Sequence, residues 1–452
     1  MIAPARVAAY AALSSVSAGR ADLPSAIASA RASLADDRDR ALVSEIVTGV
    51  QRWRAALDHV IGALARRSIE RLDPEVVEIL RLSAYQLLHL TRVPASAVVD
   101  DAVALTGRAG KRSAAGFVNA IQRAISRQRG ALSLPARPAD ASNREAALAY
   151  FSISLSHPRW LVERWYDRFG FDATEQWLQF DNAAAPLTLR ANRLRATPGQ
   201  VAARLGQYGV EVEPCRFAPD ALSVVKGRPF HADGTDDGSF IIQDEASQLV
   251  ALLAGTHPGA RVLDTCASPG GKSTALAAAM DNRGLLVACD VRPHRMELLR
   301  QTVTTCGATN VRLVQADLLS PLPFSRPFDC VLVDAPCSGL GTLRRDPDIR
   351  WRRREGELER FAASQRIMLR HAAACVAPGG RLVYATCSSE PDENEAVVDA
   401  FAADAADFEP LDLNVVATTL PSDVIDRRGH LRTFPHRHRL EAFFGAVFRR
   451  RT

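Results

Sequence analysis

Val262-Leu-Asp-Thr-Cys-Ala-Ser-Pro-Gly-Gly-Lys-Ser-Thr274 begins as an apolar strand, turns at two glycines and continues into the start of a helix. Glycine lets the backbone approach a ligand closely, and the N-terminus of a helix favours negative charge. The loop from Cys266 to Lys272 therefore predicts a ligand site. It has neither the G-x-G-x-x-G spacing of dinucleotide folds nor the Walker A spacing, which disfavours nucleotide hydrolysis.

From residue 240 onward, strands and helices alternate around this loop. Strands are predicted at 261–264, 285–290, 311–315, 329–334 and 381–386, and helices at 272–280, 293–305, 357–376 and 392–404. Such alternation predicts a doubly wound parallel sheet. Ligands of these sheets bind at the carboxyl ends of the strands, so reactive groups are expected there.

The preceding chain has a different pattern. Residues 3 to about 128 predict helices only, for example at 39–65, 73–91 and 96–107, followed by a Pro-containing linker at 131–143. Helices at 144–155, 157–169 and 173–181 then precede alternating segments and turns at 233–239, which predict a small α+β domain. We expect a multidomain chain: an all-α domain at 1–133, an α+β domain at 144–235 and a Rossmann-like α/β domain at 236–452.

Composition narrows the class of protein. The chain has 452 residues, a net charge of +5 and 47% hydrophobic residues, which permits nucleic-acid binding without requiring it. No apolar run is long enough to span a membrane, and no signal-peptide cleavage site is evident. The eight cysteines contain no Cys-x-x-Cys pair and the histidines show no paired metal-ligand spacing, so we expect no metal. Reduced thiols in the cytoplasm are expected.

Two cysteines follow apolar strands directly. Cys337 lies in Asp334-Ala-Pro-Cys-Ser-Gly339 and Cys387 lies in Tyr384-Ala-Thr-Cys-Ser388. A single free cysteine is more often packed than reactive. Two of them at strand ends of one sheet reverse that expectation, and both should face one active site. The remaining cysteines outside the loop are assigned to packing: Cys215, Cys289, Cys306, Cys330 and Cys375.

Acidic residues end the next two strands after the loop. Asp290 could accept hydrogen bonds from ribose hydroxyls, and Asp317 could bind an adenine edge. Each alone is as well explained as an ordinary strand-end cap. In register with the glycine loop on successive strands, they outline a site for an adenosine-containing cofactor.

At these residues the chain resembles the RNA cytosine-5 methyltransferases, most closely the bacterial family that modifies 16S ribosomal RNA and carries a NusB-like N-terminal domain. The segment Asp334-Ala-Pro-Cys-Ser-Gly-Leu-Gly-Thr-Leu-Arg-Arg-Asp-Pro-Asp-Ile-Arg-Trp351 resembles that family's long signature. Further similar segments are Ser156-His-Pro-Arg-Trp-Leu-Val-Glu-Arg-Trp165, Gln243-Asp-Glu-Ala-Ser-Gln248 and the NusB-like Asp37-Arg-Asp-Arg-Ala-Leu-Val-Ser-Glu-Ile-Val-Thr-Gly-Val50. Ser268 stands where alanine is usual, and Glu441-Ala stands where Asp-Gly is usual.

The resemblance implies a class I methyltransferase domain that binds S-adenosylmethionine. The implied cofactor residues are Cys266, Ala267, Ser268, Pro269, Gly270, Gly271, Lys272, Asp290, Asp317 and Asp334. It implies Cys387 as the nucleophile that attacks cytosine C6 and Cys337 as the assisting cysteine. Covalent attack makes C5 nucleophilic, which divides one difficult step into two. Asp334 could bind the cytosine N3/N4 edge or help to hold the cofactor.

The target base must be unpaired or extruded to reach these groups. The basic segment after Cys337 (Arg344, Arg345 and Arg350–Arg354 with Trp351) is expected to contact RNA at the rim of the site rather than to be only a solvated helix start.

The expected partner is 16S ribosomal RNA, free or early in assembly, and the expected state is a monomer. The alternatives are methylation of tRNA or another RNA, and a non-catalytic RNA-binding factor. DNA methylation is disfavoured because DNA enzymes place the nucleophile in the Pro-Cys motif.

Overall fold

The computed structural model describes residues 2–230, 237–416 and 419–452. The chain divides into two compact units, Met1–Ala183 with Leu343–Arg353, and Ala184–Thr342 with Arg354–Thr452. The first division falls inside the range 144–235 proposed for the middle domain, whose boundaries stay a prediction. Most of the turn cluster predicted at 233–239 lies outside the described residues.

The first unit is helical, as predicted. Its helices are α1 (Pro4–Ser17), α2 (Leu23–Ala32), α3 (Asp37–Arg52), α4 (Arg54–Ala65), α5 (Pro74–His89), α6 (Ala95–Arg108), α7 (Ala115–Arg127), α8 (Arg144–Ala149) and α9 (Arg159–Asn182). The helix predicted at 39–65 is two helices that meet at Trp53. Gly170 has a φ of 77° inside α9, so the two helices predicted at 157–169 and 173–181 are its two halves. Apolar faces of α1 to α7 form one core.

The second unit begins with a small antiparallel sheet. Its strands are β1 (Thr188–Ala191), β2 (Glu211–Pro214), β3 (Ala221–Lys226) and β4 (Phe240–Ile242), in the order β2-β3-β1-β4. Helix α10 (Pro198–Gln207) packs on it through Val201 and Leu205. The Thr197 side chain and Gln200 form a capping box at its start, which satisfies free N–H groups of the first turn. The predicted α+β character is confirmed.

The larger sheet has the order β10-β12-β9-β8-β5-β6-β7, with β11 (Leu431–Arg432) beside β12. The strands are β5 (Arg261–Asp264), β6 (Leu285–Asp290), β7 (Val311–Gln315), β8 (Phe328–Asp334), β9 (Val376–Thr386), β10 (Phe408–Leu411) and β12 (Phe444–Arg450). Strands β5 to β9 are parallel and match the predicted strands, but β10, β11 and β12 pair antiparallel. The predicted parallel sheet is therefore confirmed for β5 to β9, and the strands β10, β11 and β12, which were not predicted, extend it antiparallel because the chain returns along β9.

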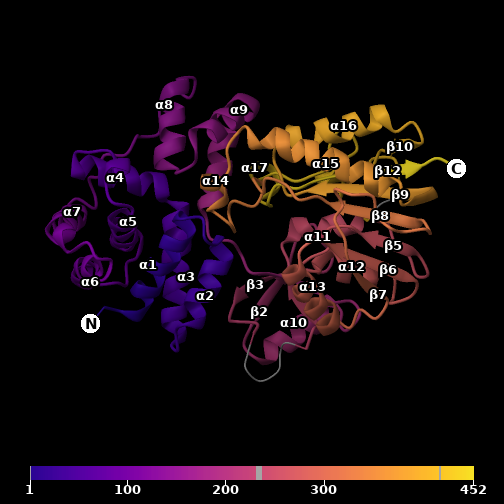
Figure 1. Cartoon of the computed structure of the whole chain (residues 1–452), viewed down its shortest axis with the longest axis horizontal. Coiled ribbons are helices and arrows are strands. Elements are labelled where there is room, and N and C mark those ends of the chain that lie inside the picture. The colour runs from indigo at the N-terminus through magenta and orange to yellow at the C-terminus, as the bar shows by residue number, and fades with distance from the viewer. Residues whose placement is uncertain (1, 231–236, 417–418) are drawn as a thin grey trace. The chain divides into compact units, whose positions relative to one another are not determined.

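Helices cover both faces of this sheet (Figure 1). One face carries α11 (Glu245–Leu252), α12 (Gly271–Ala279) and α13 (Pro293–Cys306), and the other carries α15 (Glu357–Ala373) and α16 (Glu395–Asp404). Two separate apolar clusters fill the two interfaces. Because helices cover both faces of the sheet, polar groups can gather at the carboxyl ends of β5 to β9. None of the described helices is long and apolar enough to cross a membrane.

Candidate active site

The predicted cofactor groups lie on four adjacent strands. Because the strand order is β8-β5-β6-β7, Asp334, the glycine loop, Asp290 and Asp317 lie next to one another at the carboxyl ends of these strands. Asp290 is the last residue of β6 and is buried, and its Oδ1 accepts a hydrogen bond from Arg292 N. Asp317 lies two residues beyond β7, is exposed, and accepts from Leu319 N. Residues from 264 to 334 therefore lie side by side at the carboxyl ends of the parallel strands, where ligands of such sheets bind.

The glycine loop is shaped by close contacts with α13 and with the neighbouring strand. Gly270 has a φ of 108°, and a Cβ there would lie 3.0 Å from Leu299 Cδ1, so only glycine fits. Ala267 N donates to Cys289 O at 2.8 Å, and Ser268 Oγ donates to Arg295 O at 2.9 Å. The loop is thereby tied to β6 and α13, and the serine that departs from the family pattern is used in this tie.

Lys272, in the first turn of α12, points toward the end of β8. Its Nζ donates to Asp334 Oδ2 at 2.6 Å and lies 5.9 Å from the centre of the Phe443 ring. Burial disfavours the charged lysine, but the Asp334 carboxylate outweighs burial and the pKa of Lys272 is raised. The two side chains are 14% and 24% exposed. The pair therefore joins the glycine loop to the Asp334 motif.

We expect Lys272→Met to lower the free energy of unfolding by about 2–3 kcal/mol, because the largely buried Asp334 loses its cation. Urea denaturation measures this change. Lys226→Met is the matched control, since it breaks an ion pair with Glu211 whose side chains are 71% and 61% exposed. That change should cost less than about 1 kcal/mol. Equal losses in the two variants would contradict a structural role for the Lys272–Asp334 pair.

Asp264 lies at the end of β5, beneath the loop. It is fully buried, and its Oδ2 accepts from Ser273 Oγ at 2.7 Å. Burial raises the pKa of its carboxyl to about 6, although the hydrogen bond from Ser273 opposes the shift. Asp264 was not among the predicted site residues. The signal available in the sequence was an acid at the end of an apolar strand, directly before the loop.

This shift predicts a pH dependence of stability. The folded-state pKa of Asp264, about 6, lies above the ordinary value of 3.8, so the folded protein binds this proton more tightly than the unfolded chain. The free energy of unfolding should therefore fall as the pH rises from the ordinary value of 3.8 to the folded-state value of about 6. In Asp264→Asn we expect that slope to decrease by up to about 1.4 kcal/mol per pH unit. Urea denaturation at several pH values measures it, and equal slopes in both proteins would contradict the shift.

The two predicted thiols are in contact. Strands β8 and β9 pair in parallel with Asp334 opposite Ala385, so the segments that follow run side by side. Gly341 N donates to Cys387 O at 2.9 Å, and a Cβ at Gly341 would lie 2.7 Å from that oxygen, which requires glycine. The Sγ atoms of Cys337 and Cys387 lie 3.1 Å apart. Adjacent strands thus bring together residues separated by 50 positions in the chain.

The environment of Cys337 favours its thiol form. The hydrogen bond with Cys387 and burial both raise the pKa of Cys337, and the charge of Glu393 raises it further. Burial likewise raises the pKa of Cys266, so this cysteine is unsuited to thiolate chemistry. Its position fits the expectation that it contributes backbone rather than a reactive thiol.

The basic segment that follows Cys337 differs from its prediction. Residues Leu343–Arg353 belong to the first unit, where Arg350 is fully buried. Its Nη1 donates to Ser156 O at 3.1 Å and to Asn182 Oδ1 at 3.0 Å. The predicted RNA contact is therefore wrong for Arg350, because the guanidinium satisfies buried oxygens of α9 and its preceding turn. Trp351 is half-buried, and its indole N–H donates to Gln51 O at 2.7 Å.

Arg190 is a second residue that sequence reasoning missed. It lies in β1 and is 3% exposed. Its guanidinium donates to Gln243 Oε1 at 2.8 Å, to Thr274 Oγ1 at 2.7 Å and to Gly271 O. The small sheet is therefore bonded to the first turn of α12. The only signal in the sequence was an arginine between apolar residues of a strand.

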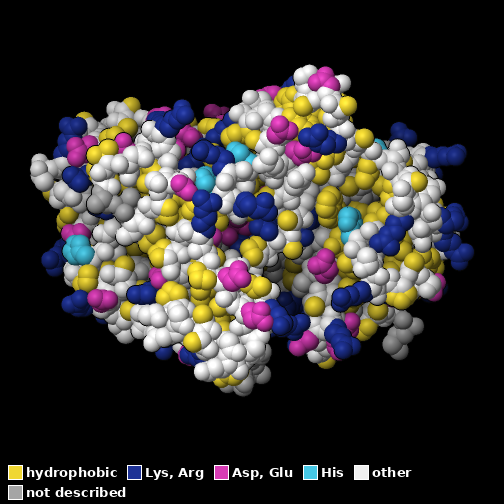
Figure 2. All heavy atoms as spheres, turned by 180° about the vertical axis from the view of Figure 1, so that it is seen from behind, with side chains coloured by type: hydrophobic (Ala, Val, Ile, Leu, Met, Phe, Trp, Pro, Cys, Tyr) yellow, Lys and Arg dark blue, Asp and Glu magenta, His cyan; other side chains and the backbone are white. Residues whose placement is uncertain are grey.

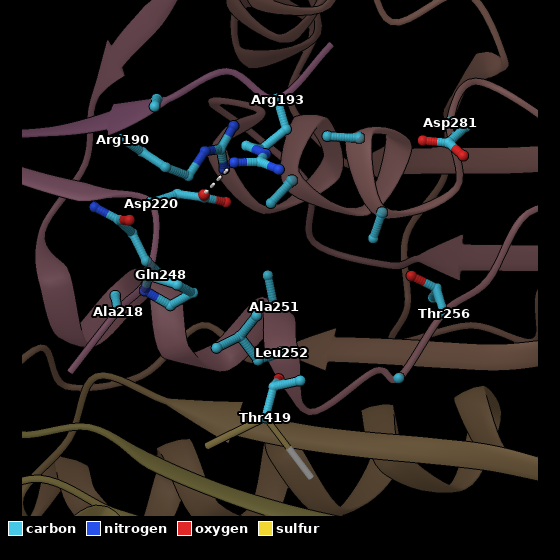
Figure 3. A pocket seen from close by; sticks show the side chains of 16 residues that line it. Arg190, Arg193, Ala218, Asp220, Gln248, Ala251, Leu252, Thr256, Asp281 and Thr419 are labelled. Carbon is cyan, nitrogen blue, oxygen red and sulfur yellow. Dashed lines mark ion pairs between the residues drawn. The ribbon is translucent and has the colours of Figure 1, made fainter. Parts of the chain in front are cut away.

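A cavity of about 460 Å³ lies beside Arg190, between the small sheet and α11–α12 (Figure 3). Arg193 and Asp220 form an ion pair of 3.8 Å on its wall. None of the predicted catalytic or cofactor residues lines this cavity. The chemistry is therefore assigned to the row of strand ends and not to this cavity.

Basic and acidic side chains are interspersed on one face of the molecule. On the face drawn in Figure 2, Lys and Arg side chains lie among Asp and Glu side chains. Among residues 2–230, 237–416 and 419–452, no group of three or more His, Cys, Asp or Glu side chains could hold a metal ion.

Three family models match successive segments of the chain. Residues 3–127 match the NusB family, residues 157–231 match the ferredoxin-like domain of RsmF/B-like methyltransferases, and residues 251–449 match the family described as 16S rRNA methyltransferase RsmB/F. The predicted order of an all-α NusB-like domain, a small α+β domain and a methyltransferase domain is confirmed.

Individual relatives are similar over nearly their whole length. The chain is 34% identical over 419 residues to the probable ribosomal RNA small subunit methyltransferase B of Bacillus subtilis, covering 92% of this chain and 91% of that protein. It is 32% identical to the ribosomal RNA small subunit methyltransferase B of Pseudomonas putida, covering 90% and 91%. Among solved structures, that of PH0851 has a TM-score of 0.81 at 27% identity and covers 99% of both chains.

Proposed function

This chain belongs to the RsmB/F family of ribosomal RNA methyltransferases, and we propose that it methylates C5 of a cytosine in 16S ribosomal RNA through a covalent cysteine adduct. The observation that carries the proposal is the contact of two thiols, with 3.1 Å between Cys337 Sγ and Cys387 Sγ, at the edge that also bears the glycine loop. Methylation of a ring nitrogen or of a ribose hydroxyl would need no cysteine pair.

The residues present fit S-adenosylmethionine as the methyl donor. Gly270, with a φ of 108°, is followed at once by α12, and the N-terminus of a helix favours a negatively charged group. Asp290 ends the neighbouring strand, where a carboxylate suits ribose hydroxyls, and Asp317, two residues beyond the end of β7, is proposed to bind the adenine edge. When bound, S-adenosylmethionine supplies a methyl group activated by a sulfonium. The nearby carboxylates of Asp264 and Asp334 favour that positive charge.

Cys387 is proposed as the nucleophile. Its thiolate adds to C6 of the cytosine, so the electron pair of the C5–C6 double bond makes C5 nucleophilic. Cys337 acts in the second half of the reaction. Once C5 has been methylated, the C5 proton must leave so that the C6–sulfur bond can break and the double bond can form again. The Cys387 hydrogen bond, burial and the Cys387 charge raise the pKa of Cys337, and bonding of the Cys387 sulfur to C6 removes the contributions of Cys387. Cys337 can then release its proton to solvent and take the C5 proton, and its 3.1 Å contact with Cys387 supports this role.

Asp334 is proposed to hold the base or the cofactor together with Lys272. Its Oδ2 is occupied by Lys272 Nζ, which leaves Oδ1 for the N4 amino group of a cytosine or for the cofactor. Lys272 in turn keeps a positive charge near the Cys387 sulfur, which contributes to the raised pKa of the lysine.

The experiment is methyl transfer from labelled S-adenosylmethionine to unmodified, protein-free 16S RNA, with the product mapped by bisulfite sequencing. A single 5-methylcytosine is the expected product. Label on tRNA but not on 16S RNA would keep the chemistry and replace the substrate. No label on any RNA, including an assembling small subunit, would support a non-catalytic RNA-binding factor.

The monomeric state and the cytoplasmic location stay predictions. Size-exclusion chromatography with light scattering tests the first, and cell fractionation tests the second.

A further inference from the structure

A buried carboxylate lies beneath both cysteine segments. Glu393, in the short turn Pro391–Glu393 after β9, is 0% exposed. Its Oε1 accepts from Ser338 N at 2.8 Å and from Gln365 Nε2 at 3.0 Å, and its Oε2 accepts from Ser388 Oγ at 2.6 Å. Ser338 follows Cys337 and Ser388 follows Cys387. One side chain therefore binds the residue next to each thiol.

Burial of a carboxylate without a cation is costly unless hydrogen bonds compensate. Within the described residues, Glu393 has no ion pair and is satisfied by the three donors above. Gln365 of α15 strengthens the same arrangement, since its Nε2 also donates to Pro336 O at 3.0 Å. The Tyr384 hydroxyl donates to the carbonyl oxygen of Glu393 at 2.6 Å. All of these partners belong to the two cysteine segments or to the helix packed against them.

The arrangement has an electrostatic consequence at the thiols. The ionisable groups that face Cys337 are Cys387 and Tyr384 from β9 and its end, and Glu393 from the following turn. After the hydrogen bond with Cys387 and burial, the negative charge of Glu393 is a further cause of the raised pKa of Cys337. The charge of Lys272 in turn interacts with Cys387.

We propose that Glu393 is a positioning residue, whose carboxylate holds the segments of Cys337 and Cys387 together so that the two sulfurs stay in contact. This inference rests on the proposed function for its role in methyl transfer. The reaction needs both sulfurs at one base, because Cys387 adds to C6 and Cys337 assists loss of the proton from the neighbouring C5.

The first test needs neither RNA nor cofactor. In a Cys387→Ala background, alkylation of Cys337 by iodoacetamide is followed against pH by peptide mass spectrometry. Glu393→Gln preserves the size of the side chain and removes its charge, so we expect the midpoint of alkylation to shift by about 0.5–1 pH unit to lower pH. Glu390→Gln is the matched control, since Glu390 is also buried but bonds Ser389 rather than Ser338. Superimposable profiles with and without the Glu393→Gln substitution would overturn the charge effect.

The second test measures the positioning effect on catalysis. Glu393→Ala removes all three hydrogen bonds, and a displacement of about 1 Å at reacting groups costs on the order of 100-fold in kcat. The KM for S-adenosylmethionine should stay within about twofold, because the glycine loop, Asp290 and Asp317 follow strands other than β8 and β9. Glu393→Gln should recover most of kcat at its own optimal pH, which a merely structural loss would not do. An unchanged kcat in Glu393→Ala would overturn the proposal.

The two proposals can fail separately. If the wild-type protein methylates no RNA, the proposed function fails, and the alkylation profile still decides whether Glu393 controls Cys337. If Glu393→Ala is unfolded by near-ultraviolet circular dichroism, Glu393→Gln carries both measurements, and a wild-type alkylation profile together with wild-type kinetics would overturn the inference.

Discussion

Replacement of Cys387 by alanine should lower methyl transfer by about 10⁴-fold or more, because the reaction then lacks the nucleophile that activates C5. The other groups at the site are held by contacts that do not involve this sulfur: Lys272 by Asp334, and Ser388 by Glu393. Cofactor affinity and the thermal unfolding midpoint should therefore stay close to wild type. Single-turnover methylation with labelled S-adenosylmethionine measures the loss.

The control for this variant is Cys215→Ala. Cys215 is half-buried beside the apolar core of the larger sheet, and burial raises the pKa of its thiol to about 12. It is therefore unreactive and lies outside the proposed machinery, so its replacement should leave methyl transfer within about twofold of wild type. Methylation that survives in Cys387→Ala at more than a small fraction of the wild-type rate would refute the assignment of the nucleophile.

Replacement of Cys337 by alanine should have a different signature. Cys387 can still add to C6 and C5 can still be methylated, but proton removal from C5 loses the group in contact with the nucleophile. We expect turnover to fall by about 10²–10⁴-fold, the range of general acid–base assistance, while a covalent protein–RNA adduct accumulates. Denaturing gel electrophoresis of the protein with labelled RNA detects this adduct as a band of reduced mobility.

The double variant Cys337→Ala/Cys387→Ala is the control for the adduct. It should form none, because the accumulated bond is to Cys387. A Cys337→Ala protein that loses turnover without accumulating adduct would mean that Cys337 acts before the covalent step. A Cys387→Ala protein that still forms the adduct would exchange the roles of the two cysteines.

Much of the second unit was predictable because its signals are local. A strand, two glycines and a helix start occupy consecutive residues around Gly270, and the alternation of strands and helices repeats the pattern. The carboxyl-end rule then implies that Asp290, Asp317 and Asp334 share an edge, which the strand order bears out. Strand β12, between β10 and β9, was missed, since an antiparallel return along β9 leaves no signal in the alternating pattern.

The burial and the bonding partners of two arginines could not be predicted from the neighbouring sequence. Arg350 lies in a run of arginines, which favours a solvent-exposed basic segment, yet its side chain is buried against Ser156 and Asn182. Arg190 looked like an ordinary strand residue, yet it bonds the first turn of α12. In both cases the partners are distant along the chain, and a run or a strand pattern contains no information about them.

The groups from which the chemistry is proposed could be read from the sequence alone: two cysteines at strand ends, a glycine loop before a helix, and acids after the following strands. Each depends on backbone conformation over a few residues or on a rule common to parallel sheets. The contact of the two thiols is a property of the tertiary structure. Pairing of β8 with β9 brings their sulfurs to 3.1 Å, and the Glu393 carboxylate accepts hydrogen bonds from Ser338 and Ser388, the residues next to each thiol. Hydrogen bonds and charges act through space, so their effect on a thiol depends on residues that the sequence does not place beside it.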